Sequence, residues 1–184
     1  MTSAFQVRQA ARVLHSGGLL AYPTEAVWGL GCDPLNANAV YRLLELKKRP
    51  IEKGMILVAA SIEQLSAFTQ PLTEDIKEKV SATWPGPATW LLPASPEAPY
   101  WVRGKHRSIA VRVSDHPVVQ ALCKAFGGPI VSTSANLSSR PPAKTSTQVR
   151  LRCPGVDGIL EGDLGGLTRP TPIRDAISGK QIRS

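Results

Sequence analysis

Hydrophobic residues recur along this chain at two spacings, one typical of helices and one of strands. A first set shares one face of a helix and comprises Val7, Ala10, Ala11 and Leu14. Ser3 and Gln6 have the spacing of a capping box at the start of that helix, and Gly17-Gly18 is typical of its end. The apolar run 19–22 that follows predicts a short buried strand.

The same two spacings predict the remaining elements. Helices are expected from Asn36 or Asn38 to just before Pro50, from Ser61 to Phe68, after Thr73, over 116–126 and near Thr147, and strands at 55–60, 89–92, 108–113, 128–131, 158–160 and 171–176. This alternation predicts an α/β fold built on an open twisted sheet that is parallel in part. The 184 residues are enough for one core, and no repeat or linker divides them, so we expect a single domain over 1–184.

A polar pair stands at the end of the first predicted strand, in the segment Tyr22–Gly31. Thr24 and Glu25 follow Pro23, and Gly29 and Gly31 come shortly after. One interpretation is a β-turn with Pro23 at its second position. The other is a place where side-chain and backbone groups meet a ligand, with Thr24 as a binding residue and Glu25 as a base or magnesium ligand.

Three basic residues, Lys47, Lys48 and Arg49, close the second predicted helix. Cations are favourable at a helix C-terminus without any function. Lys47, however, continues the apolar stripe of Val40, Leu43 and Leu44, which predicts that its ammonium points inward, whereas Lys48 points to solvent. Arg49 precedes Pro50, where the backbone is extended, and its guanidinium can grip phosphate oxygens at two points. Lys47 and Arg49 are therefore candidate phosphate ligands.

Two further segments carry candidate ligands. In the strand 108–113 the large apolar residues alternate onto one face and leave Ala110 with Arg112 on the other, where Arg112 can meet a carboxylate or a phosphate. After the strand at 128–131 comes Ser132-Thr133-Ser134-Ala135-Asn136-Leu137-Ser138, which we expect to be a loop. Its short polar side chains suit either local turn bonds or an anion.

Taken together, Tyr22–Gly31, Lys47-Lys48-Arg49-Pro50 and the Ser132–Ser138 run resemble, in order and spacing, the YrdC-like family of threonylcarbamoyl-AMP synthases, in particular its short bacterial branch. The resemblance extends from about residue 10 to residue 175. It implies a mixed sheet with a concave basic groove. It also implies that Lys47 and Arg49 bind the triphosphate, that Ser132, Ser134 and Asn136 hold nucleotide phosphates, and that Thr171 is the Ser/Thr found near the final strand.

The resemblance also implies a reaction. L-threonine, bicarbonate or CO₂, and ATP give threonylcarbamoyl-AMP and pyrophosphate, with Mg²⁺ as the expected metal ion. The product is then used by separate transferase proteins that modify the tRNA adenosine next to the anticodon as threonylcarbamoyladenosine. Which residues hold the metal is left open.

Composition leaves one rival function in place. Lysine and arginine total 22 against 14 aspartate and glutamate, a net charge of +8, which suits polyanions such as ATP or RNA. A non-catalytic RNA-binding protein of tRNA or ribosome maturation is therefore the alternative, although the aromatic content of 5% is low for base stacking. Three widely spaced cysteines favour reduced thiols and a cytoplasmic protein, and no apolar run is long enough to cross a membrane.

Overall fold

A mixed β-sheet runs through the centre of the molecule. The computed structural model describes residues 2–137, 140–169 and 171–183, and within them the sheet has nine strands in the order β7-β1-β2-β6-β3-β5-β4-β8-β9. Their bounds are β1 Leu20–Pro23, β2 Trp28–Gly31, β3 Ile56–Ala59, β4 Thr89–Pro93, β5 Ser108–Val113, β6 Ile130–Ser134, β7 Gly158–Ile159, β8 Ile173–Asp175 and β9 Gln181–Arg183. β1 with β7, β3 with β5 and β4 with β8 are parallel, and the other neighbours are antiparallel. The predicted α/β fold with a partly parallel sheet is confirmed.

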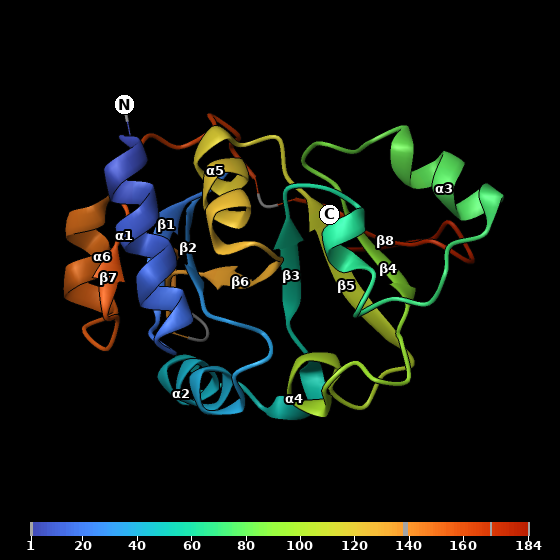
Figure 1. Cartoon of the computed structure of the whole chain (residues 1–184), viewed down its shortest axis with the longest axis horizontal. Helices are drawn as coiled ribbons and strands as arrows, with labels where there is room; N and C mark the ends of the chain where they lie inside the picture. The colour runs from blue at the N-terminus through green and yellow to red at the C-terminus, as the bar shows by residue number, and fades with distance from the viewer. Residues whose placement is uncertain (1, 138–139, 170, 184) are drawn as a thin grey trace.

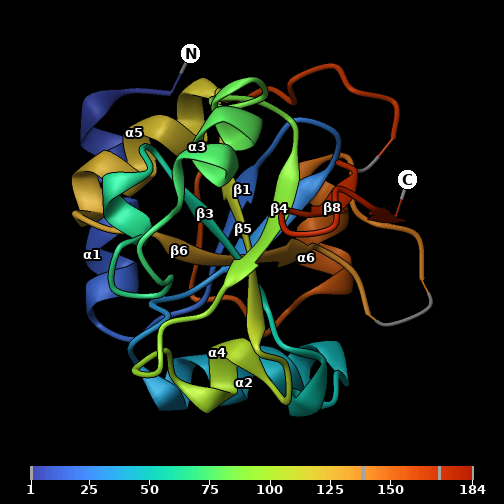
Figure 2. The ribbon, with the colours of Figure 1, turned by 90° about the vertical axis from the view of Figure 1, so that its right-hand side faces the viewer.

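Helices surround this sheet (Figure 1). Their bounds are α1 Ala4–His15, α2 Ala37–Lys47, α3 Glu74–Ser81, α4 Tyr100–Arg103, α5 Pro117–Phe126 and α6 Ser146–Arg152, with 3₁₀ turns η1 Ile51–Lys53 and η2 Glu63–Leu65. Figure 2 shows α1 and α5 together on one side of the sheet, and α2 with α4 along one end of it. No helix in the described ranges is both long and apolar enough to pass through a bilayer.

The helix termini follow from local side-chain chemistry. The capping box predicted for α1 is present, because Ser3 accepts from the Gln6 N–H and Gln6 accepts from the Ser3 N–H. α2 begins at the Asn36 cap, and its last residue, Lys47, is followed by Lys48 in the left-handed conformation at φ 49°. This sharp exit from the helix separates the two lysines, so that Lys47 is buried and Lys48 is exposed, as its place on the helix predicted.

The core is formed by two clusters, one on each side of the strands. The alternation of β3 divides its residues between them: Leu57 and Ala59 join the larger cluster, while Val58 joins the cluster under α1 and α5. β5 is in parallel register with β3 and pairs Ala110 with Ile56 and Arg112 with Val58. The register therefore places Ala110 and Arg112 on the sheet face opposite to Val111, as the sequence predicted.

Several local predictions are wrong. No strand was predicted directly after Glu25, yet Gly29 and Gly31 lie in β2, which forms a hairpin with β1. Ser132 and Ser134 belong to β6 rather than to a loop, because β6 pairs with β2 and β3 on its two sides. Ser61 does not cap a helix, since Gln64 accepts from the Ala60 N–H and only the short turn η2 follows. α4 and β9 were not predicted at all.

Candidate functional site

All the predicted site residues line one cavity of about 650 Å³. It is bounded by the loop between β1 and β2, the end of α2, the strands β3, β5 and β6, and the segment before β8. The predicted residues in its wall are Thr24, Lys47, Arg49, Arg112, Ser132, Ser134, Asn136 and Thr171. Ser138 of the predicted loop lies outside the described residues.

Lys47 is held by the segment that follows β6. Its Nζ lies 2.6 Å from the Ser134 carbonyl oxygen, 2.7 Å from the Asn136 carbonyl oxygen and 2.6 Å from Asn136 Oδ1. A longer contact of 3.5 Å reaches Ser134 Oγ, so the ammonium group, which has three N–H donors, is surrounded by oxygen acceptors of this segment. Lys47 therefore fixes the conformation of the turn at residues 134–136 while its stem forms part of the cavity wall.

The environment of Lys47 also alters its titration. The residue is 4% exposed. Burial lowers the pKa of the Lys47 ammonium to about 8, and the nearby charge of Arg49 acts in the same direction.

The neighbouring polar side chains are connected to one another. Ser134 Oγ donates to Asn136 Oδ1 at 2.6 Å, and Asn136 Nδ2 donates to the Arg140 carbonyl oxygen. Ser132 is 7% exposed. It lies two residues before Ser134 in β6, opposite Ile56 of β3. The strand and the turn thus present a row of hydroxyl and amide groups along one side of the cavity.

Arg49 lies at the other side of Lys47 and is fixed by a glycine. Its Nε and Nη2 donate to the Gly54 carbonyl oxygen at 3.2 and 2.9 Å. Gly54 has φ +62°, and a Cβ there would lie 2.7 Å from the Arg103 carbonyl oxygen, so no larger residue fits without movement of the backbone. The guanidinium of Arg49 is half-buried at the cavity wall.

Arg112 forms a buried ion pair that sequence reasoning did not predict. Its Nη2 lies 3.1 Å from Glu25 Oε2, and the two side chains are 8% and 5% exposed. On its other side, Arg112 Nη1 donates to Thr171 Oγ1 at 2.8 Å. Glu25 Oε1 in turn accepts from Ser114 Oγ at 2.6 Å. The hairpin loop, β5 and the segment before β8 therefore meet at one polar cluster.

Thr24 has a structural contact within its own loop. Its Oγ1 donates to the Val27 carbonyl oxygen at 2.7 Å, and its N–H donates to the same oxygen at 3.2 Å. These two bonds close the four-residue connection between β1 and β2. The Glu25 side chain points inward from this connection. The sequence had left three roles open for Glu25: a turn residue, a base or a metal ligand.

Three further ionisable residues in the cavity wall, Lys53, Arg103 and His106, were not assigned to the site from the sequence. Arg103 Nη1 donates to the His106 carbonyl oxygen at 2.8 Å. The basic segment 103–112 was a signal for Arg103 and His106. Because α4 was not predicted, nothing in the sequence placed that segment beside the cavity. With Lys47, Arg49 and Arg112, they give the ionisable lining a mainly cationic character.

His116 is the N-cap residue of α5, but its side chain makes no capping hydrogen bond. The imidazole is 4% exposed, and its Nε2 lies 3.1 Å from the Asp163 carbonyl oxygen. Burial lowers the pKa of His116 below its ordinary value. The three cysteines, Cys32, Cys123 and Cys153, are buried free thiols.

The acidic residues give little support for a protein-built metal site. Among residues 2–137, 140–169 and 171–183, no three histidine, cysteine, aspartate or glutamate side chains gather as a metal site would require. Glu25 is the single carboxylate in the described cavity lining, and it is engaged by Arg112 and Ser114.

The mixed sheet and this cavity define an α/β protein with a cavity whose ionisable lining residues are mainly basic. The chain belongs to the Sua5/YciO/YrdC family, whose model, described as "Telomere recombination", matches residues 12–184. It is 56% identical over 184 residues to a threonylcarbamoyl-AMP synthase of Halorhodospira halophila, covering 99% of this chain and 96% of that protein. It is 53% identical to the enzyme of the same name from Pseudomonas aeruginosa, covering 100% and 99%.

Solved structures agree with this assignment. Sua5 of P. abyssi, in a complex with L-threonine, superposes with a TM-score of 0.88 at 32% identity and covers 94% of this chain. This chain spans about half of that protein, 51% of its length. YciO of E. coli superposes with a TM-score of 0.82 at 25% identity, covering 99% of this chain and 92% of YciO. The family and the fold implied by the sequence motifs are thus confirmed.

Proposed function

We propose that this protein is a threonylcarbamoyl-AMP synthase, which makes L-threonylcarbamoyladenylate for the threonylcarbamoyladenosine modification of tRNA. The observation that carries the proposal is the gathering of the eight predicted residues around one cavity, in a chain 56% identical to an enzyme of this name over nearly its whole length. ATP and L-threonine are the substrates, and P. abyssi Sua5 has been crystallised with the second of them.

The reaction consists of two bond-forming steps. The neutral amine of threonine attacks the carbon of CO₂, supplied as such or by dehydration of bicarbonate, and loses a proton to give a carbamate. A carbamate oxygen then attacks the α-phosphorus of ATP, the bond to the β-phosphate oxygen breaks, and pyrophosphate leaves. The protein's tasks are to align three substrates and to balance the charge that develops on the phosphates.

The charges in the cavity suggest how it is divided. Arg49, Lys53 and Arg103 lie close to Gly54, whose carbonyl oxygen accepts from Arg49 and which packs against the Arg103 carbonyl oxygen, and this part of the cavity suits the highly charged triphosphate. Arg112 is already partly neutralised by Glu25, so its site suits a singly charged group. Of the two partners left open for Arg112 by the sequence, we therefore propose the carboxylate of threonine. Ser132, Ser134 and Asn136 would contact the nucleotide phosphates, and Thr24 and Thr171 would contact the amino acid.

Magnesium is proposed to enter with ATP. Mg²⁺ commonly keeps several waters and is held by substrate phosphates with one or two carboxylates. Glu25 would be the nearest acidic group in the described lining, but its oxygens are engaged by Ser114 and Arg112, so we assign no protein ligand to the metal. When bound, the ion would neutralise charge on the leaving pyrophosphate.

The test is a pyrophosphate-release assay with ATP in which threonine and bicarbonate are omitted in turn. Release should require both. Equal release without either one would contradict the proposed reaction. Replacing threonine by serine or valine in the same assay measures how the site selects its amino acid.

We also propose that the protein contacts tRNA and the transferase proteins that use the adenylate. The net charge of +8 supports a weak electrostatic attraction to tRNA, which would fall steeply with salt, whereas threonine binding would change little. Titration of tRNA and of threonine at low and high salt separates the two. Salt-resistant, sequence-selective RNA binding without threonine binding would favour a non-catalytic RNA-binding protein instead.

A further inference from the structure

The ion pair between Glu25 and Arg112 is more deeply buried than any other in the described chain. Its side chains are 5% and 8% exposed, whereas in each of the other pairs both side chains are exposed by 35% or more. Taking two charges out of water is costly, and a buried ion pair is often no more stabilising than apolar residues of the same size. Its presence beside a ligand cavity therefore points to a role other than stability.

Arg112 is anchored from two sides. Thr171 Oγ1 accepts from Nη1 at 2.8 Å, and Glu25 Oε2 lies 3.1 Å from Nη2. The long arginine side chain reaches this point from β5 through several rotatable bonds, so these contacts decide the plane of the guanidinium. Arg112 Nε is buried and has no hydrogen-bond partner among the described residues, whereas Glu25 Oε2 faces Arg112 Nη2 as an ion-pair contact. The cluster thus leaves one N–H of the guanidinium that its own residues do not satisfy.

Glu25 lies in a hairpin loop, but contacts from other parts of the chain fix both its side chain and its backbone. Its Oε1 accepts from Ser114 Oγ at 2.6 Å, and Ser114, which is fully buried, is bound through its N–H to the Ala59 carbonyl oxygen at 3.1 Å. The backbone of Glu25 is fixed as well, because its carbonyl oxygen accepts from the Leu167 N–H at 2.9 Å. Both ends of the residue are therefore held by elements outside its loop.

We infer that Glu25 is a positioning residue for the reaction, which holds the Arg112 guanidinium in the plane that receives the carboxylate of the amino-acid substrate. The inference rests on the proposed function for the identity of that substrate. Glu25 acts through Arg112, and Ser114 sets the direction of the Glu25 carboxylate. The negative charge of Glu25 also makes the site less favourable for a phosphate group, which carries more negative charge than a carboxylate, so the amino acid rather than the triphosphate is assigned to Arg112.

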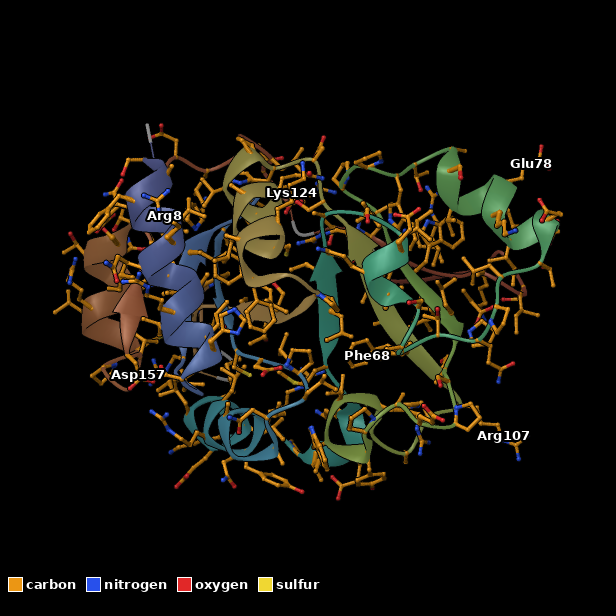
Figure 3. All side chains as sticks on the ribbon, viewed as in Figure 1. Arg8, Phe68, Glu78, Arg107, Lys124 and Asp157 are labelled. Atoms are coloured by element: carbon orange, nitrogen blue, oxygen red, sulfur yellow. The ribbon has the colours of Figure 1, made fainter. Side chains whose placement is uncertain are left out.

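The variant that tests this is Glu25→Gln, because glutamine keeps the shape and can still bond to Ser114 while it removes the charge facing Arg112. We expect the KM for threonine to rise roughly tenfold, since a small misplacement of a binding group is costly. The KM for ATP and the melting temperature should change little. Glu78→Gln is the matched control, because Glu78 is exposed on α3 at the edge of the molecule (Figure 3) and does not line the cavity.

A double-mutant cycle with Arg112→Lys separates positioning from a direct or purely structural role. Lysine keeps the charge but has no planar fork to orient. If Glu25 acts through Arg112, Glu25→Gln should add less than about a twofold rise in the threonine KM in that background. An equal rise in both backgrounds, or an equal rise in the KM for ATP, would overturn the inference, and so would an unchanged threonine KM.

A second measurement does not depend on the proposed reaction. Nitrogen-15 NMR of the arginine side chains reports whether rotation of a guanidinium group is hindered. In the unliganded protein we expect resolved Nη signals for Arg112, assigned by their loss in Arg112→Lys, and we expect them to merge in Glu25→Gln. Retention of hindered rotation in Glu25→Gln would overturn the inference even if threonine-dependent pyrophosphate release is found. Loss of hindered rotation in a protein that releases no pyrophosphate would contradict the proposed function alone.

Discussion

Lys47 and Asn136 are joined at two points: the lysine Nζ lies 2.7 Å from the Asn136 carbonyl oxygen and 2.6 Å from its Oδ1. The contact links the last residue of α2 to the turn after β6, two segments that are 89 residues apart in the chain. Because a buried ammonium needs acceptors and this turn supplies them, each segment fixes the other. Lys47 therefore contributes to the site first by fixing the conformation of the turn. A phosphate would then bind to a turn that is already ordered before the ligand arrives.

Replacing Lys47 should affect both turnover and stability. In Lys47→Met the apolar stem is kept, but the acceptors of Ser134 and Asn136 lose their buried donor, which should lower the free energy of unfolding by about 2 kcal/mol. Pyrophosphate release should fall on the order of a hundredfold because the turn loses its shape. Urea denaturation and the pyrophosphate assay measure the two effects.

Lys48→Met is the matched control for this change, since Lys48 is adjacent, carries the same charge and is exposed. It should retain nearly full turnover and stability. Equal losses in the two variants would mean that the cavity needs only general basicity. Full activity in Lys47→Met would remove Lys47 from the site.

The lowered pKa of Lys47, about 8, predicts a pH dependence of ATP binding. The ammonium is fully charged below this value, so ATP affinity should decline as the pH rises through about 8, and the decline should be absent in Lys47→Met. Between pH 8 and the ordinary lysine pKa of 10.5, the unfolded chain binds more protons at this position than the folded one. The contribution of Lys47 to the free energy of unfolding therefore increases with pH across that window.

Isothermal titration calorimetry of ATP from pH 7 to pH 9.5 tests the predicted decline in ATP affinity. The wild-type protein and Lys47→Met are measured in the same buffers. ATP carries its full phosphate charge throughout most of this range, so its own titration adds little. A flat profile for the wild-type protein would contradict a role for the Lys47 charge in nucleotide binding.

Sequence patterns predicted the direction of two cavity residues, Lys47 and Arg112, because both lie on regular elements. Lys47 follows the buried stripe of α2, and Arg112 alternates with the buried residues of β5, so period alone gave the direction of each side chain. The ion pair with Glu25 could not be predicted in this way. It joins a hairpin loop to a strand 87 positions later along the chain, and the direction of a loop side chain depends on contacts such as those of Ser114 and Leu167.

The errors have a common physical cause. β2 contains Gly29 and Gly31, which ordinarily weaken a strand, yet the β1 and β6 neighbours on its two sides compensate through backbone pairing. The Ser132–Ser134 segment was expected to be a loop for the same reason, since polar residues with turn preference lie there in a central strand. In both cases, tertiary pairing outweighs local propensity. The site lies where these two strands meet, which is why the prediction failed close to it.

Removing the hydroxyl of Thr171 should weaken binding of the amino acid. Thr171→Val keeps the volume but leaves Arg112 Nη1 without its 2.8 Å acceptor, so the guanidinium is held mainly by Glu25. We expect the threonine KM to rise about fivefold, corresponding to roughly 1 kcal/mol for one hydrogen bond, with a smaller change for ATP. Steady-state pyrophosphate release gives both constants. Thr147→Val, at an exposed position of α6, is the control, and an unchanged threonine KM in Thr171→Val would exclude Thr171 from this site.

The segment around Gly165 should also be sensitive to substitution, because it is packed directly on the loop that carries Glu25. The Gly165 N–H donates to the Thr24 carbonyl oxygen at 3.1 Å, and a Cβ at this position would lie 2.9 Å from Glu25 Cα. Gly165→Ala must therefore displace backbone atoms of one segment or the other, which should cost about 1–3 kcal/mol of unfolding free energy. Since Glu25 moves with its backbone, the threonine KM should rise as well.

Gly128→Ala is the matched control for Gly165→Ala. A Cβ there meets only Phe126 Cε1, at 4.0 Å, so stability should stay within about 0.5 kcal/mol of the wild-type value. Thermal denaturation of both variants, followed by threonine titration of the pyrophosphate assay, compares them directly. If Gly165→Ala is as stable as Gly128→Ala and keeps the wild-type threonine KM, then the segment yields easily and does not fix Glu25. If Gly165→Ala loses stability while the threonine KM is unchanged, the packing at Gly165 matters for the fold only. The position of the Glu25 carboxylate is then maintained by its side-chain contacts with Ser114 and Arg112.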